Sequence, residues 1–141
     1  MIRPVLFAAI VLSIAAPAFA QDATPQGLSI ELNAATNAES GGCTFSFLIE
    51  NGTETEIDSA VFEAVLFDDA GQVDRLTLFD FGALPQGRPR VRQFTVPGRA
   101  CEDFGRVLFN GVHACDAGDA GPAVCAAGLT VGTRTEIEVI G

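Results

Sequence analysis

Four aspartates around a single glycine are the first residues in this sequence that could do chemistry. The stretch LFDDAGQVDRLTLFDF, residues 66–81, places Asp68, Asp69, Asp74 and Asp80 near Gly71. Carboxylates bind calcium, but an EF-hand loop needs acidic residues at positions 1, 3 and 5, glycine at 6 and glutamate at 12. Here the acids are adjacent, Gly71 is at position 4 when Asp68 is position 1, and no glutamate follows at the required place. The pattern therefore favours a hairpin with a type I turn, a left-handed Gly71 and an Asp68 side chain bonded to the turn backbone.

A second aspartate-rich stretch is DAGDAG, residues 116–121. Its glycine and aspartate content is typical of a loop, because such residues cannot pack a core. We expect no metal and no cofactor. The alternative is a small-ligand or calcium-binding domain that uses the two Asp-rich loops, residues 68–74 and 116–119.

Residues for catalysis are scarce. His113 is the only histidine, so no second histidine is available for a metal site or a proton relay. None of the four serines of residues 21–141 lies in a G-x-S-x-G nucleophile motif. We therefore expect no catalytic residue and no enzyme.

Three arginines recur at every second residue in LPQGRPRVRQF, residues 84–94. Arg88, Arg90 and Arg92 would point to one side of a strand. Either they face solvent and pair with neighbouring acids, which stabilises little, or they form a stripe that binds an anionic partner. Phe94 shares the parity of the arginines, so we expect a bulge or a change of face within this strand.

The first 20 residues have the pattern of a secretory signal peptide. Arg3 precedes an apolar run from Val5 to Ala16, and Ala18-Phe19-Ala20 gives the small-x-small cleavage pattern. The apolar run is shorter than the roughly 18 residues that span a bilayer, so we expect cleavage and no membrane span in the mature chain. Residues 21–141 then form one domain, periplasmic or secreted.

The mature chain is strongly acidic, with seven basic and 18 acidic residues and a net charge of −11. This charge argues against nucleic acid and anionic membranes as partners. Its four cysteines, Cys43, Cys101, Cys115 and Cys125, show no C-x-x-C spacing. An even number of cysteines in an exported chain favours two structural disulfides over a zinc or redox site.

Short β-rich runs separated by glycine, proline, asparagine and aspartate predict an all-β, immunoglobulin-like sandwich of about seven strands, with almost no helix. The runs begin at Leu28 and Cys43 and continue over residues 60–67, 73–81, 90–96, 106–113 and 129–140. Residues 60–67 are apolar on both parities apart from Glu63, which suits a central strand. Residues 129–140 alternate along their length, which predicts one final strand.

This topology favours one disulfide pairing. In such a sandwich the second and sixth strands run in the same direction, so Cys43 and Cys115 would lie at opposite ends. Pairing of Cys43 with Cys101 and of Cys115 with Cys125 fits the strand order. The sequence alone permits three connectivities.

Four segments carry a resemblance to known proteins: LSIELNAA, CTFSFLIENG, LFDDAGQV and LPQGRPRVRQF. Together they resemble small exported alphaproteobacterial proteins that are often labelled Tat-pathway signal domain proteins and have no known function. More distantly, a second strand that ends in Asn51 and is followed by Phe-Asp-x-x-Gly-x-Val, residues 67–73, is similar to bacterial immunoglobulin-like domains of the FxLYD kind. This likeness covers only the second to fourth predicted strands. The resemblance implies a periplasmic β-sandwich and brings no catalytic residues.

Taken together, the sequence predicts a non-enzymatic periplasmic protein that serves as a protein-interaction or structural module of the cell envelope. The expected partner is another envelope protein, and the expected contact is the arginine stripe, Arg88, Arg90 and Arg92.

Overall fold

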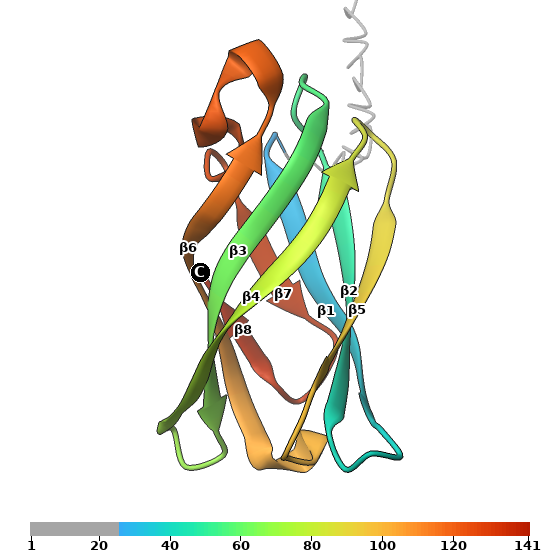
Figure 1. Cartoon of the computed structure of the whole chain (residues 1–141), viewed down its shortest axis with the longest axis vertical. Helices are drawn as coiled ribbons and strands as arrows, with labels where there is room; N and C mark the ends of the chain where they lie inside the picture. The colour runs from blue at the N-terminus through green and yellow to red at the C-terminus, as the bar shows by residue number, and fades with distance from the viewer. Residues whose placement is uncertain (1–25) are drawn as a thin grey trace, which may run out of the picture.

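Two four-stranded sheets pack face to face in the computed structural model, which describes residues 26–141 (Figure 1). The strand orders are β5-β2-β1-β7 and β4-β3-β6-β8. Three short 3₁₀ turns, η1–η3, lie in the connections, and the described chain has no α-helix. The predicted all-β sandwich is therefore confirmed. The strands are β1 Leu28–Asn37, β2 Cys43–Asn51, β3 Ile57–Asp68, β4 Val73–Leu84, β5 Arg90–Val96, β6 Phe104–Asp116, β7 Thr130–Thr133 and β8 Glu138–Ile140.

The alternation in the first two strands fixes which face is buried. Leu28, Ile30 and Leu32 of β1 have at most 1% of their surface exposed, and the polar residues between them face outward. In β2 every second residue from Cys43 to Asn51 is buried in the same way. Because side chains on a strand alternate between two faces, this pattern turns the apolar face of both strands toward the opposite sheet. A pairing shifted by one residue would expose that face, so the pattern also fixes the register between the two strands.

Phenylalanines dominate the core between the sheets. The ring of Phe47 lies in the centre, with five other rings at centroid distances of 5.1–6.3 Å, and it is fully buried. Its partners come from both sheets: Phe45, Phe79, Phe81, Phe94 and Phe109. Tilted and edge-to-face rings at these distances attract one another beyond the area they bury.

Both predicted disulfides are present. Cys43 pairs with Cys101, which joins the start of β2 to η1 (Cys101–Asp103) at one end of the sandwich. Cys115 pairs with Cys125 and closes the loop that holds η2 (Gly118–Ala120) and η3 (Pro122–Cys125) at the other end. No free cysteine remains in the described chain.

The turn between β3 and β4 has the predicted hairpin geometry. The Gly71 N–H donates to the carbonyl of Asp68 at 3.1 Å, and Gly71 is left-handed with a φ of 84°. The Asp68 carboxylate accepts from the N–H groups of Ala70 and Gln72 at 3.0 and 2.9 Å. A register shift next to Phe67 marks the accompanying bulge. Asp68 is therefore a turn residue.

Gly71→Val should lower the free energy of unfolding by about 1–2 kcal/mol, because a β-branched residue at this positive φ is strained. Asp69→Asn keeps the backbone bonds of the turn and should change the free energy by less than about 0.5 kcal/mol. Urea unfolding of both variants measures the difference. A larger loss in Asp69→Asn than in Gly71→Val would show that the carboxylate matters more than the turn.

The last run departs from the prediction of a single strand. Residues 130–133 form β7 and pair in parallel with β1, whereas residues 138–140 form β8 and pair in parallel with β6. The chain crosses between the sheets at residues 134–137, where Arg134 N–H donates to the carbonyl of Leu32 at 2.9 Å. Both halves turn apolar residues toward the same core, so the alternation continues through the crossing.

No helix within residues 26–141 is long and apolar enough to cross a membrane. The predicted signal peptide, residues 1–20, lies outside the described residues.

Candidate functional site

The longest open edges of the two sheets lie on the same side of the sandwich. β4 and β5 are the outer strands of their sheets, so each pairs with a neighbour on one side only (Figure 1). The edge strands at the other side, β7 and β8, are much shorter. An edge strand leaves a row of backbone N–H and C=O groups without strand partners. We call the surface formed by residues 73–99 the β4–β5 edge.

Exposed apolar side chains gather on this edge. Among the described residues, the large apolar side chains with high exposure are Val73, Leu76, Leu78 and Val91, with exposed fractions of 57, 61, 47 and 60%. The first three lie on β4 and Val91 lies on β5. On the outer face of its sheet, Leu76 is paired in register with Val65 of β3. Leu76 and Leu78 lie two residues apart on one strand face, and exposed apolar groups gathered in this way mark interaction surfaces.

A hollow of about 400 Å³ opens between β4 and β5. The rings of Phe79 and Phe94 are part of its wall, with centroids 4.7 Å apart. At one end, the Arg75 guanidinium of β4 donates to the carbonyl of Pro97 at 2.7 Å and so ties the two edges together. The hollow is large enough for one or two side chains of a bound polypeptide.

The predicted arginine stripe is only partly available to a partner. Arg88 precedes β5 and is exposed, whereas Arg90 and Arg92 lie on β5 with the inner-facing Phe94. The register between β2 and β5 has no shift from Arg90 to Val96, so the predicted bulge or change of face is absent. Arg90 and Arg92 can share the inward-facing positions of Phe94 because β5 is an edge strand, where a long side chain can leave the core.

Arg92 has a structural role at this edge. Its Nε donates to the carbonyl of Phe81 at 2.8 Å, and its Nη2 donates to the carbonyl of Ala83 at 3.2 Å. These carbonyls belong to β4, so the side chain bridges the two sheets. Covering part of an edge in this way prevents unwanted strand pairing.

Arg92→Ser should lower the free energy of unfolding by about 1–2 kcal/mol, because charge-assisted bonds to two carbonyls are lost. Arg88→Ser is the matched control and should stay within about 0.5 kcal/mol of the wild type. Chemical denaturation of both variants measures the effect. Equal stability of the two variants would contradict a structural role of Arg92.

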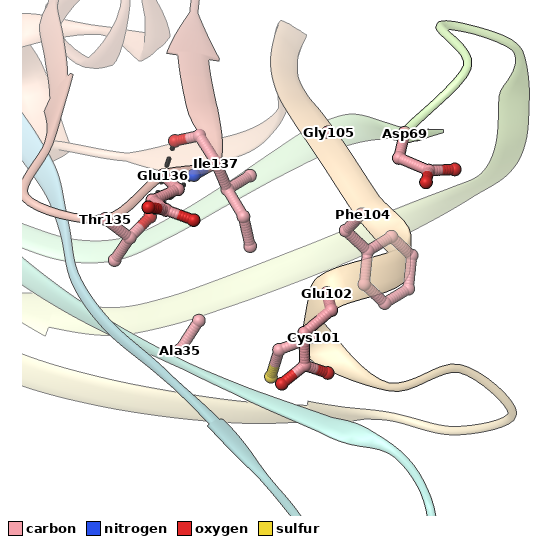
Figure 2. Close-up of a pocket in the computed structure, with 9 residues that line it drawn as sticks. All are labelled: Ala35, Asp69, Cys101, Glu102, Phe104, Gly105, Thr135, Glu136 and Ile137. Carbon is pink, nitrogen blue, oxygen red and sulfur yellow. Dashed lines mark hydrogen bonds between the residues drawn. The ribbon is translucent and has the colours of Figure 1, made fainter.

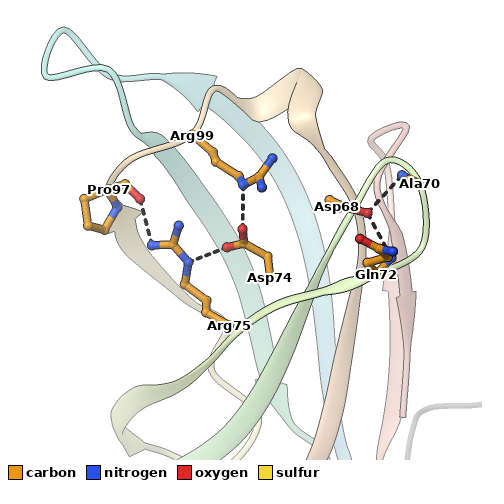
Figure 3. Close-up of polar contacts among 7 residues, drawn as sticks. All are labelled: Asp68, Ala70, Gln72, Asp74, Arg75, Pro97 and Arg99. Carbon is orange, nitrogen blue, oxygen red and sulfur yellow. Dashed lines mark hydrogen bonds and ion pairs between the residues drawn. The ribbon is translucent and has the colours of Figure 1, made fainter.

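Asp74 is held by two arginines (Figure 3). Arg75 Nε lies 2.6 Å from one carboxylate oxygen and Arg99 Nε lies 2.5 Å from the other. The hydrogen bond from Arg75 is the main cause that lowers the pKa of Asp74 below its ordinary value, with a smaller contribution from Arg99, while partial burial opposes the shift. Only 9% of the side chain is exposed. Asp74 is therefore committed to linking β4 with the loop after β5.

The lowered pKa of Asp74 makes part of the stability pH-dependent. A carboxyl whose folded pKa is depressed stabilises the fold above its unfolded pKa, near 3.9, and this contribution is lost as the pH falls through the folded pKa. Asp74→Asn should cost about 1–2 kcal/mol at neutral pH and progressively less below about pH 4. Urea unfolding across this range measures the difference, which a constant gap between the two proteins would contradict.

An acidic hollow of about 430 Å³ lies at the end of the sandwich where the chain crosses between the sheets. Asp69, Glu102 and Glu136 line it together with Phe104 and Ile137 (Figure 2). Glu102 accepts bonds from Asn37 Nδ2 at 2.9 and 3.1 Å. Within residues 26–141, no group of three or more His, Cys, Asp or Glu side chains is arranged to hold a metal ion.

The remaining candidates lie apart from these surfaces. The Asp116 carboxylate accepts from the N–H of Gly118 at 3.1 Å, a local turn bond within the second cysteine loop. His113 is exposed and occupies a bulge of β6, opposite the register shift between Val61 and Phe62. The sequence pattern did not single out Leu76 and Leu78 as exposed. The available signal was that Leu76 and Leu78 lie on the same strand face as Asp74 and Asp80, which indicates an exposed face.

Comparison with known proteins found no protein family, no curated protein and no solved structure that matches this chain.

Proposed function

We propose that this protein is a non-enzymatic interaction domain of the cell envelope that binds another protein through its β4–β5 edge. One observation carries the proposal: the large, highly exposed apolar side chains of the described residues all lie on the edge strands β4 and β5. Burying such side chains against a partner removes apolar surface from water, which favours association.

The form of the edge suggests how a partner binds. β4 and β5 each have no strand partner along one side, and the hollow between them is walled in part by Phe79 and Phe94. An extended segment that adds to an exposed strand gains backbone hydrogen bonds and places alternate side chains into neighbouring pockets. The β4–β5 edge offers both features.

An extracytoplasmic location fits this proposal. Disulfides persist in oxidising compartments, and the structure contains two. The pattern of residues 1–20 adds the expectation of export to the periplasm or beyond.

Calcium or small-ligand binding by the Asp-rich loops has weaker support. The carboxylates of Asp68 and Asp116 accept local backbone bonds, and that of Asp74 is paired with two arginines. A cation would have to replace these contacts to bind there.

Affinity capture from a periplasmic extract tests the proposal with three forms of the mature protein: the wild type, Leu76→Ser/Leu78→Ser and the matched control Ala126→Ser. Ala126 is an exposed apolar residue far along the chain from the β4–β5 edge. We expect a defined protein to be recovered with the wild type and the control, and to be lost with the double variant. Circular dichroism checks that the double variant is folded.

Recovery of the same proteins in equal amount with all three forms would overturn the proposed contact surface. Loss of recovery with Ala126→Ser would contradict it as well, because binding would then depend on residues outside the edge.

A further inference from the structure

Positive charge is concentrated on the β4–β5 edge of an otherwise acidic protein. Residues 73–99 contain five arginines and two aspartates, a net charge of +3. The rest of residues 26–141 contains two arginines and 15 carboxylates, a net charge of −13. A charge distribution of this kind steers an anionic partner toward the edge and away from the remaining surface.

Two of the five arginines remain available. Asp74 engages Arg75 and Arg99, and the β4 carbonyls engage Arg92. Arg88 is exposed, and the half-buried Arg90 donates only to the carbonyl of the adjacent Pro89, at 3.0 Å. Neither guanidinium makes an ion pair within the described part of the chain.

The geometry of β5 indicates what an added strand would have to present. β5 pairs with β2 through an unbroken register and has no strand on its other side, where Arg92 Nη1 donates to the carbonyl of Val91 at 3.2 Å. A strand added there would place alternate side chains beside Arg90 and the intervening ones beside Val91, on opposite faces. A carboxylate beside Arg90 and an apolar side chain beside Val91 would satisfy both positions.

We infer that the partner is an extended polypeptide segment in which acidic and apolar residues alternate, and that it adds as a strand to the free edge of β5. The inference rests on the proposed function, because it specifies what the β4–β5 edge binds. Arg88 and Arg90 contact the carboxylates of the partner, whereas Arg75 and Arg92 hold the two edges in place.

Titration of the mature protein with blocked peptides of about eight residues, the length of an ordinary strand, tests the inference. The probe alternates Glu and Val. Calorimetry should detect binding of this peptide and no binding of a Lys–Val or Gln–Val peptide. Arg88→Ser/Arg90→Ser should bind the Glu–Val peptide about tenfold more weakly, since two exposed ion pairs are lost.

Arg106→Ser/Arg134→Ser is the matched control, because it removes the same charge from outside the edge and should bind within about twofold of the wild type. Arg106 and Arg134 pair with Glu138 and Glu31. An unchanged melting temperature of Arg88→Ser/Arg90→Ser shows that its lower affinity does not arise from unfolding.

Three outcomes would overturn the inference. A Gln–Val peptide that binds as tightly would remove the acidic requirement. A control peptide has the same composition, with all Glu residues before all Val residues. If it binds with equal affinity, alternation does not matter and strand addition is contradicted. A polyuronate oligosaccharide bound as tightly would remove the polypeptide class.

The failure of the inference is distinguishable from that of the proposed function. If the Glu–Val peptide does not bind but a periplasmic protein is still captured through Leu76 and Leu78, the partner has another chemistry and the contact surface stands. If capture is unaffected in Leu76→Ser/Leu78→Ser, the contact surface itself is wrong.

Discussion

Replacing Cys43 and Cys101 by alanine should lower the free energy of unfolding by roughly 4 kcal/mol. The disulfide closes a loop with a sequence separation of 58, and the entropy removed from the unfolded chain grows with the length of the closed loop. The same model gives roughly 3 kcal/mol for the bond between Cys115 and Cys125, whose separation is 10. Urea unfolding of the two double variants under oxidising conditions measures both losses.

The Cys115→Ala/Cys125→Ala variant is the control for this comparison. Its bond closes a loop at the far end of the sandwich, so its removal leaves the contact between β2 and η1 intact. A greater loss of stability from this variant than from Cys43→Ala/Cys101→Ala would show that loop length does not govern the effect.

Phe47→Ala should be about as severe, with a loss of about 3–5 kcal/mol. The ring is fully buried and contacts five other rings from both sheets, so its removal leaves a cavity that the rigid strands cannot close. The shift in the midpoint of urea unfolding, at constant slope, measures the loss.

Phe67→Ala is the matched control for the core. Phe67 is half-buried on the outer face of β3, where the Arg106 guanidinium lies 5.8 Å from its ring centroid. Its truncation should cost about 1 kcal/mol, because the ring contributes mainly this cation–π contact. Equal losses at Phe47 and Phe67 would contradict the assignment of the inner and outer faces.

The inner faces of the strands were predictable from sequence because alternation is a local property. Residues such as Ile30 and Phe45 recur at every second position, and burial of one face is enough to produce that pattern. The disulfide pairing was predictable as well. It follows from the direction of the strands, which places Cys43 and Cys101 at the same end.

Assignment to one sheet or the other is not a local property. Residues 129–140 alternate without interruption, yet Val131 belongs to a strand in one sheet and Val139 to a strand in the other. Both sheets turn their inner faces to one core, so the alternation is the same whichever sheet the strand joins. The split into β7 and β8 was therefore hidden.

The bridging role of Arg92 was hidden in the sequence for a related reason. Arg90 and Arg92 have the parity of Phe94, and the sequence does not show that β5 is an edge strand where a long side chain can lie on the inner parity and leave the core. The carbonyl acceptors of Arg92 lie on β4, which is not its partner in the sheet. Similarly, only the strand order shows that Leu76 has no covering layer.

The parallel pairing of β7 with β1 has a consequence for the order of folding. Ser29 of β1 is in register with Thr130 of β7, so β1 can form this pairing only after residues 130–133 have been synthesised. Long-range pairing of this kind gives a high contact order and slow folding. During synthesis, the edges of β1 and β6 stay open until residues 130–140 emerge. A chain that stops before Thr130 would therefore present two long edges to other chains and would be prone to aggregate.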